Sequence, residues 1–412
     1  MLHRGLPRAA ASCAHASLRT RPLIAHPPAA ALIAAALLAT ACAGVRGSAT
    51  AGAPVAPPAS GAAADASREA IAEAHRRADA ATDALVSRFW SSGAGAFTAS
   101  PGGSRAAEYW LSAQALASVI DGVERTGGRR WADVPRAFIS AQDARGWRRD
   151  YVDDENWMAL ALLRWSELAG DATARARAEA LLDDIAQAWD ETCCGEHPGG
   201  IWWDRAHTQK ATASNAGPVI TAVRLYERTG DRSRLELARK VFAYWAAEMV
   251  DPATGQVADH IEPSGRKVWW RFTYDQGTMI GAALALYGAT KEPGYLDVAR
   301  KIARFMRAEE TEASARGAIL SDGPSCAGDC EQFKGIAQRY LAELAEVDPG
   351  GGWAELLRAD AAAVWDLARD AATDTFGVDW AGPFHGASIA TQSSASTTLE
   401  LRARAAGPGR GR

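Results

Sequence analysis

The 412-residue sequence lacks the short motifs that mark several large enzyme classes. It contains no His-Glu-x-x-His zinc motif, no Gly-x-Ser-x-Gly nucleophile motif, no Walker A loop and no Gly-x-Gly-x-x-Gly dinucleotide fingerprint. Its eight histidines show no metal-ligand spacing, and its cysteines form no Cys-x-x-Cys pair. We therefore expect no metal and no organic cofactor, with a calcium ion in a carboxylate loop as the alternative.

The sequence also lacks an excess of basic residues. It has 45 Lys and Arg against 49 Asp and Glu, for a formal net charge of -4, so we expect no nucleic-acid partner. Its apolar and charged fractions, 48% and 23%, are those of a soluble globular protein. Tryptophan is in unusual surplus, with 15 residues against eight Tyr and nine Phe. Some of these indoles fill a core, and others could stack on sugar rings in a groove.

Acidic residues are absent before Asp65, while arginines recur near the N-terminus. The apolar run 29–38 is too short to span a bilayer and is typical of a secretory signal. Small residues then precede Cys42, as in a bacterial lipobox, although Ala39 stands where Leu is usual. We therefore expect residues 1–42 to be a signal peptide. Cys42 becomes the lipid anchor of an extracytoplasmic, membrane-attached protein, or simple cleavage releases it.

Residues 43–66 are rich in Ala, Gly, Pro and Ser, and we expect them to form a flexible linker. Residues 404–412 are predicted to be a disordered tail, which leaves 67–403 as the folded domain.

Four cysteines fall in this domain, an even number that indicates disulfides in an exported chain. The expected pair is Cys326 with Cys330. A bridge from this loop to Cys193 or Cys194 is an alternative, and so are free buried thiols.

Apolar residues recur with helical spacing almost throughout, as in the stripe along 295–306. Only 200–203 and 267–273 suggest short strands. One turn sequence is repeated at 167–171, 226–231 and 287–292, a period of about 60 residues that holds a helical hairpin and a long loop.

Helices before each turn are apolar nearly all round, as in 157–163 and 279–286, whereas those after it are amphipathic. An inner ring of buried helices within an outer ring gives this contrast. The sequence therefore predicts an all-α (α/α)6 toroid of about six hairpins, rather than an open solenoid.

In such a ring, the residues just before each inner helix line one mouth of the barrel. These segments concentrate acids, amides and indoles, which suit a polyhydroxylated substrate; they are 151–157, 199–204, 210–218, 272–277 and 332–336.

Asp153 and Asp154 are the candidate catalytic pair among these segments. An Asp-Asp pair on its own is more often a helix N-cap with a second acid that suits the helix dipole. Beside the other polar segments at the barrel mouth, two adjacent carboxyl groups could flank one glycosidic bond, at the separation of about 5–5.5 Å that retention of configuration requires. One must be ionised as nucleophile, and repulsion from it keeps the other protonated.

These segments resemble glycoside hydrolase family 76, the retaining α-1,6-mannanases, over roughly residues 85–400. The motifs that carry the resemblance, in order, are Tyr151-Val152-Asp153-Asp154-Glu155-Asn156-Trp157, Gly199-Gly200-Ile201-Trp202-Trp203, Ser214-Asn215, Tyr274-Asp275-Gln276-Gly277 and Phe333-Lys334-Gly335-Ile336. The resemblance implies an (α/α)6 fold, with Asp153 as nucleophile and Asp154 as general acid/base. It also marks a departure, because the family usually has Asn where this chain has Asp275.

The expected substrate-binding residues are Trp202, Trp203, Asn215, Tyr274, Asp275, Gln276, Phe333 and Lys334, with Gln392 as a weaker candidate. The expected activity is hydrolysis of α-1,6-mannosidic bonds in a mannan-type polysaccharide by a monomer. Transglycosylation at the same site and a non-catalytic glycan-binding lipoprotein are the alternatives.

Overall fold

The computed structural model describes residues 61–128, 130–196 and 198–407, all within one unit that spans residues 59–412. The predicted signal peptide, Cys42 and most of the predicted linker lie outside the described residues. The first helix begins at Gly61, ahead of the predicted domain start at 67, and the last ends at Ala405, inside the predicted tail.

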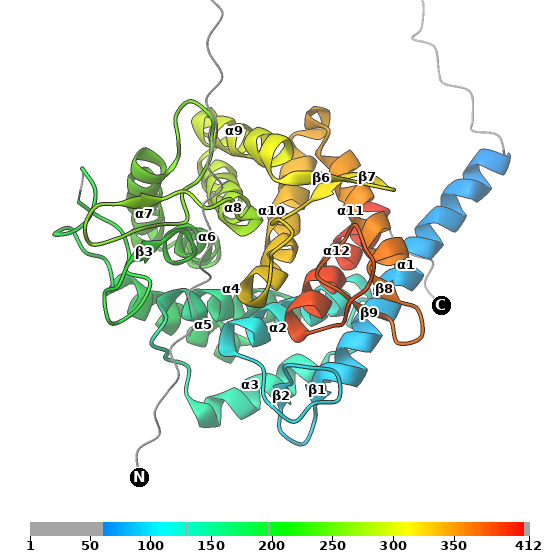
Figure 1. Cartoon of the computed structure of the whole chain (residues 1–412). Coiled ribbons are helices and arrows are strands. Elements are labelled where there is room, and N and C mark those ends of the chain that lie inside the picture. Colours follow the sequence, from blue (N-terminus) through cyan, green and yellow to red (C-terminus); the bar gives the residue numbers. More distant parts are fainter. Residues whose placement is uncertain (1–60, 129, 197, 408–412) are drawn as a thin grey trace, which may run out of the picture. The chain divides into compact units, whose positions relative to one another are not determined.

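Twelve α-helices form two concentric rings in the described chain (Figure 1). Each inner helix packs against the next, and the last returns to the first; they are α2 (Tyr109–Arg125), α4 (Val152–Ala169), α6 (Thr212–Thr229), α8 (Thr273–Thr290), α10 (Phe333–Val347) and α12 (Ile389–Ala405). The outer helices are α1 (Gly61–Phe89), α3 (Asp133–Arg145), α5 (Ala172–Ala186), α7 (Arg232–Met249), α9 (Pro293–Glu309) and α11 (Trp353–Leu367). The predicted (α/α)6 toroid is confirmed.

The contrast between buried and half-buried helices follows the apolar pattern. Every residue of α8 from Thr273 to Leu284 is buried, because both faces of this helix contact other helices. Helix α9 instead buries a single stripe that includes Leu296, Ile302 and Met306, and it exposes its charged face.

The repeated turn closes three inner helices in the same way. Gly170, Gly230 and Lys291 each adopt the left-handed conformation just after α4, α6 and α8. Asp171 and Asp231 then cap the following outer helices by accepting backbone N–H hydrogen bonds. The chain therefore reverses direction at each turn and places outer helices beside inner ones.

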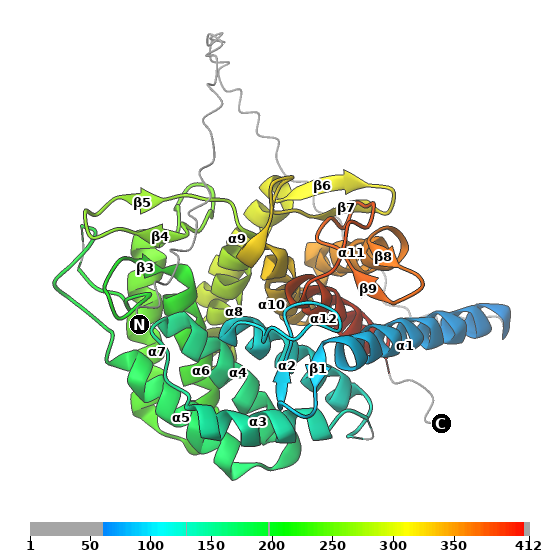
Figure 2. The ribbon, with the colours of Figure 1, turned by 60° about the horizontal axis from the view of Figure 1, so that its bottom comes forward.

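Strands are short and antiparallel. They are β1 (Trp90–Ser91) with β2 (Ala96–Phe97), β3 (Lys210–Ala211) with β4 (His260–Ile261) and β5 (Lys267–Val268), β6 (Thr311–Ser314) with β7 (Gly317–Leu320), and β8 (Arg369–Asp370) with β9 (Thr375–Phe376). Two 3-10 helices, η1 (Gly328–Gln332) and η2 (Pro349–Gly351), flank α10. The strand expected over 267–273 is wrong beyond residue 268, because residues 269–272 form no regular structure and α8 begins at Thr273. Figure 2 shows hairpins β4–β5 and β6–β7 at one end of the helical ring.

The ring closes through polar contacts between α2 and α12. Oγ of Ser118 lies 2.6 Å from Oγ1 of Thr397, and Nε of Arg125 donates a 2.5 Å hydrogen bond to Glu400. Between these two residues of α2, the buried Asp121 pairs with Arg164 of α4 and Arg339 of α10. Although burial opposes it, the guanidinium groups hold the pKa of Asp121 below its ordinary value. Within the described residues, no helix is long and apolar enough to cross a bilayer.

Candidate active site

Asp153 and Asp154 stand in the first turn of α4, at the end of the ring that carries the long loops. The N-cap position belongs to Tyr151, which makes no side-chain capping bond, so neither aspartate is an N-cap. The N–H of Val152 donates a 2.7 Å hydrogen bond to the backbone oxygen of Trp203. The start of α4 is thereby joined to the loop that follows the Gly-Gly motif.

Asp153 has the properties of a reactive carboxylate. Its Oδ1 atom is shielded from solvent and has no hydrogen-bond partner within the described chain. Burial raises the pKa of Asp153 to about 7, and the negative charge of Asp329 also raises it. Hydrogen bonds from the Trp203 side chain and from backbone N–H groups at the helix start act in the opposite direction. Asp154, next to it, is buried.

The two residues after the pair hold this helix end in place. Oε1 of Glu155 accepts hydrogen bonds from the backbone N of Arg149 at 2.7 Å and from Arg205 at 2.9 Å. Oδ1 of Asn156 accepts a 2.8 Å hydrogen bond from Thr221 of α6. Burial raises the pKa of Glu155 to about 7 as well. The acid pair is therefore fixed by buried polar contacts on the residues beside it.

The Gly-Gly motif packs against an aromatic ring. A Cβ atom on Gly199 or on Gly200 would lie 2.6 Å from the ring of Tyr244, and Gly200 also has φ +95°. Lys210 is buried, and its ammonium group donates to the backbone oxygens of Gly199, Asp190 and Cys193 at 2.6, 2.9 and 2.9 Å. Tyr244 and Lys210 were not among the predicted site residues, although they shape the loop.

Both cysteine pairs in the described domain form disulfides. Cys326 is joined to Cys330, as expected, and the adjacent residues Cys193 and Cys194 are joined to each other. The bridge between the two loops and the free thiols, which were the alternatives, are therefore not present.

The two tryptophans of the Gly-Gly loop have different surroundings. Trp202 is buried, and its ring stacks on His207 at 4.6 Å with the ammonium group of Lys210 4.8 Å away. Trp203 is half-buried, packs on Tyr151 at 4.7 Å and hydrogen-bonds Asp153. Trp203 is therefore at the acid pair, whereas the faces of Trp202 are covered by protein groups.

Asn215 holds the same loop to α6. Its Oδ1 atom accepts a 2.8 Å hydrogen bond from the N–H of Ile201, and its Nδ2 atom donates to the oxygens of Ile201 and Ala211 at 3.0 and 2.9 Å. The amide is fully buried and satisfied by backbone groups. Its position links the loop to the barrel.

Helix α8 brings three predicted residues to the mouth. The hydroxyl of Tyr274 donates a 2.7 Å hydrogen bond to Asp259, and burial, followed by the charge of Asp259, raises the pKa of Tyr274 well above its ordinary value. The amide of Gln276 accepts a 2.9 Å hydrogen bond from the N–H of Val257. Asp275 is 0% exposed, and both of its carboxyl oxygens are shielded from solvent. Burial, and next the charge of Asp259, raise the pKa of Asp275 well above its ordinary value.

The start of α10 contributes Phe333 and Lys334. The Phe333 ring lies 4.3 Å from the ring of Tyr274 and is half-buried. Lys334 is buried and donates a 2.7 Å hydrogen bond to the backbone oxygen of Val378. Gln392, the weaker candidate, donates to the oxygen of Ala81 at 3.0 Å. Of the predicted binding residues, Trp203 thus contacts Asp153, whereas Tyr274 and Phe333 pack on each other at the starts of α8 and α10.

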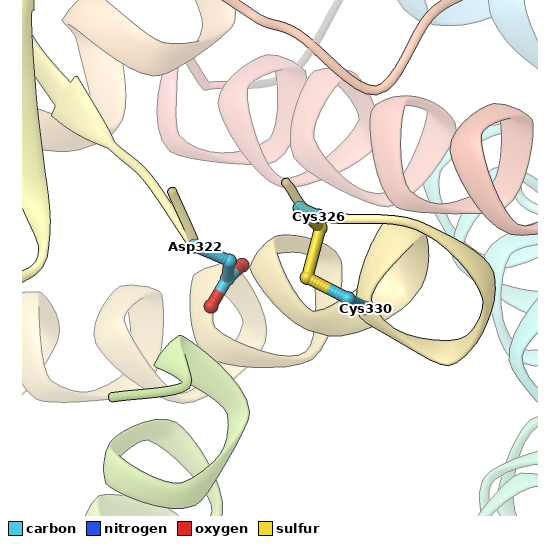
Figure 3. Close-up of side chains that lie close together, drawn as sticks. All are labelled: Asp322, Cys326 and Cys330. Atoms are coloured by element: carbon cyan, nitrogen blue, oxygen red, sulfur yellow. A yellow bond between two sulfur atoms is a disulfide. The ribbon is translucent and has the colours of Figure 1, made fainter. Parts of the chain in front are cut away.

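Asp322 lies beside the Cys326–Cys330 disulfide (Figure 3). The spacing of these three side chains suits a metal ion, but the two sulfur atoms are bonded to each other and offer no thiolate. The carboxylate of Asp322 accepts hydrogen bonds from the N–H and hydroxyl of Thr273 at 2.6 and 3.0 Å. Asp322 therefore secures the start of α8.

A cavity of about 860 Å³ lies at the opposite end of the ring. It is bordered by charged side chains such as Arg164, Glu167 and Arg339. Glu167 is in the last turn of α4, about 20 Å along the helix from Asp153. This cavity is therefore separate from the acid pair.

The family model for glycosyl hydrolase family 76 matches residues 73–406. The chain belongs to glycosyl hydrolase family 76. The match covers both rings of helices and both aspartates.

Similar curated proteins come from yeasts. The chain is 24% identical over 181 residues to mannan endo-1,6-alpha-mannosidase DCW1 of Candida glabrata, covering 42% of this chain and 40% of the relative. It is 26% identical over 191 residues to DFG5 of Saccharomyces cerevisiae, with the same coverage. The chain thus matches well under two thirds of the length of these relatives.

Solved structures match over more of the chain. The GH76A alpha-1,6-mannanase from Salegentibacter sp. HEL1_6 has a TM-score of 0.73 and 29% identity, covering 80% of this chain and 99% of that chain. An inactive variant of that enzyme, with two consecutive aspartates replaced by asparagine, was solved in complex with alpha-1,6-mannotriose; it is 28% identical to this chain, with the same TM-score and coverage.

Proposed function

We propose that this protein is a glycoside hydrolase that cleaves α-1,6-mannosidic bonds of a mannan-type polysaccharide with retention of configuration. The observation that carries the proposal is the acid pair, Asp153 and Asp154, in the first turn of an inner helix at the loop-bearing end of a family 76 barrel. The relative from Salegentibacter supports it, because its inactive variant has two consecutive aspartates replaced.

The proposed roles are those that the resemblance to family 76 implies. The carboxylate of Asp153 attacks the anomeric carbon, since its Oδ1 atom has no partner in the described chain and the helix N-terminus stabilises its charge. The carboxyl group of Asp154 donates its proton to the departing glycosidic oxygen. It then removes a proton from the water that hydrolyses the glycosyl ester on Asp153. Trp203, hydrogen-bonded to Asp153, orients the nucleophile.

An assay on linear α-1,6-mannan tests this proposal. We expect the wild type to shorten the polymer and release products that first appear as the α-anomer. We expect Asp153→Asn and Asp154→Asn each to lower kcat by at least about a thousandfold. Asp150→Asn is the matched control, because Asp150 is an exposed aspartate just before the helix and should stay active. Equal cleavage by Asp153→Asn and the wild type would refute the proposed nucleophile.

The same assay separates the two alternative functions. Products longer than the starting oligosaccharide, dominant at low acceptor concentration, would indicate a transglycosylase. Binding of mannan without cleavage by the wild type would indicate a glycan-binding protein.

We also propose that the protein works outside the cytoplasm, attached through Cys42. Two disulfides support an oxidising compartment. Fractionation tests the anchor: the wild type should sediment with membranes, and Cys42→Ala should become soluble. A wild type found wholly in the soluble fraction would refute lipid attachment.

A further inference from the structure

Trp270 is an exposed tryptophan at the loop-bearing end of the ring. Its side chain is 48% exposed, the largest fraction among the exposed large apolar residues of the described chain. It lies in the short segment between β5 and α8, two residues before Phe272. Large apolar side chains that face solvent beside a site often mark a binding surface, because their burial by a ligand is favourable.

Trp270 begins a row of aromatic rings that ends at Tyr274, in the first turn of α8. Its ring lies 5.7 Å from that of Phe272, which lies 5.1 Å from Phe333, which in turn lies 4.3 Å from Tyr274. Tyr274 and Asp153 stand in the first turns of the inner helices α8 and α4, at the same end of the ring. The row therefore runs from the solvent-exposed rim to the mouth where the proposed nucleophile lies.

The segment that carries Trp270 is fixed at both ends. Val268 pairs with His260 in the small sheet, and the N–H of Thr273 is held by Asp322. The ring of His260 packs edge-on against Trp270 at 5.3 Å, and Nδ1 of His260 bonds to Asp259 at 2.6 Å. The indole is therefore supported from the protein side while about half of it faces solvent. Because its side chain is already held in place, it loses little further conformational entropy when a ligand binds.

We propose that Trp270 forms an outer carbohydrate subsite, where its exposed face stacks on the apolar face of a sugar ring at least one unit away from the cleaved bond. The inference rests on the proposed function for the identity of the sugar, an α-1,6-linked mannose chain. An indole suits this role because it supplies a large, rigid apolar surface with few rotatable bonds. The subsite favours long chains, since only these reach from Asp153 to the rim.

Chain-length dependence tests the subsite. We compare kcat/KM on a long α-1,6-mannan with that on α-1,6-mannotetraose for the wild type, Trp270→Ala and Trp270→Phe. In Trp270→Ala the ratio of the two values should fall about tenfold, and Trp270→Phe should keep most of it because a ring remains.

Trp269→Ala is the matched control. Trp269 is the adjacent residue and is 40% exposed, but it makes no ring contact with another described residue. We expect the ratio of the two kcat/KM values in Trp269→Ala to equal that of the wild type. An unchanged ratio in Trp270→Ala, or an equal fall in Trp269→Ala, would overturn the subsite.

A binding measurement keeps the two proposals distinguishable. If the wild type cleaves no mannan, the proposed function fails, and affinity electrophoresis in gels that contain α-1,6-mannan decides the subsite. Retardation of the wild type that is lost in Trp270→Ala supports it. Equal retardation of both proteins, or of neither, refutes it.

Discussion

Burial raises the pKa of Asp153 to about 7, and the negative charge of Asp329, far away in the sequence, adds to this effect. Asp329 is part of η1, inside the loop closed by the Cys326–Cys330 disulfide. The ionisation of the proposed nucleophile therefore depends on a loop that precedes a different inner helix.

We expect kcat/KM to rise with pH up to about 7, because Asp153 must lose its proton to act as the nucleophile. Asp329→Asn removes a negative charge and lowers the pKa of Asp153, so the acidic limb should move to lower pH by about half a unit. Asp297→Asn, on the exposed face of α9 with a side chain 71% exposed, is the control and should leave the limb in place. A limb that stays at the same pH in Asp329→Asn would contradict the electrostatic link.

Asp275→Asn is expected to make the protein more stable at neutral pH. Burial in the folded state raises the pKa of Asp275 well above its ordinary value, whereas in the unfolded chain the pKa is about 3.9. Because the folded pKa is the higher one, the stability present below pH 4 is lost as pH rises towards the folded pKa. Asparagine removes this loss, so the free energy of unfolding should rise by about 1–3 kcal/mol at pH 7 and change little at pH 4.

Urea unfolding of both proteins at pH 4, 5.5 and 7 measures this effect. Other buried acids with raised pKa values, such as Asp360 and Asp322, remain in the variant, so its stability should still fall with pH, but less steeply. Parallel curves for the wild type and Asp275→Asn would show that Asp275 is ionised in the folded protein.

Lys210→Met should destabilise the Gly-Gly loop. The substitution leaves three backbone oxygens without their shared donor, at a cost of about 2–4 kcal/mol in the free energy of unfolding. Lys240→Met is the control, since Lys240 is an exposed partner of Glu191 and should change stability by less than about 1 kcal/mol. Chemical denaturation compares the two, and equal effects would contradict the role of Lys210 as the donor that holds the loop.

Gly277→Ala should force α8 and α10 apart. A Cβ atom there would lie 2.5 Å from Cα of Ala337, a backbone atom that cannot move alone, and we expect a loss of about 1–3 kcal/mol. Gly288→Ala lies in the same helix, where its Cβ would meet only Oε1 of Glu227 at 4.0 Å, and it should gain about 0.5–1 kcal/mol. Thermal unfolding gives the sign of each change. A stabilising Gly277→Ala would disprove the close approach of the two helices.

The ring and the place of the acid pair could be predicted from the sequence because each depends on local pattern. The repeated turn uses left-handed residues at Gly170, Gly230 and Lys291, and these fix where each helix ends. An inner helix must start soon after each loop, which puts Asp153 at the mouth. Helical periodicity alone carries this information.

The hydrogen-bond partners of individual polar side chains at the mouth could not be predicted in the same way. Asn215, Gln276 and Lys334 bond to backbone groups of loops, and the path of a loop is not encoded in its local pattern. The pairing of Cys193 with Cys194 also depends on that path. The sequence pattern places Trp270 in a strand over 267–273 and therefore does not predict the row of rings. The two consecutive tryptophans shortly before Phe272 are the available signal.

The contact of Ser118 with Thr397 joins α2 to α12, two helices that lie far apart in the sequence. Helix α12 packs against α1, α2 and α10, so the ring is complete only when this helix has docked on two helices that lie about 270 residues or more earlier in the chain. Without α12, the facing sides of α2 and α10 lose their neighbour in the inner ring. A premature stop before Ile389 therefore removes the one helix of the described ring that contacts both α2 and α10, and the remaining helices cannot form a closed barrel.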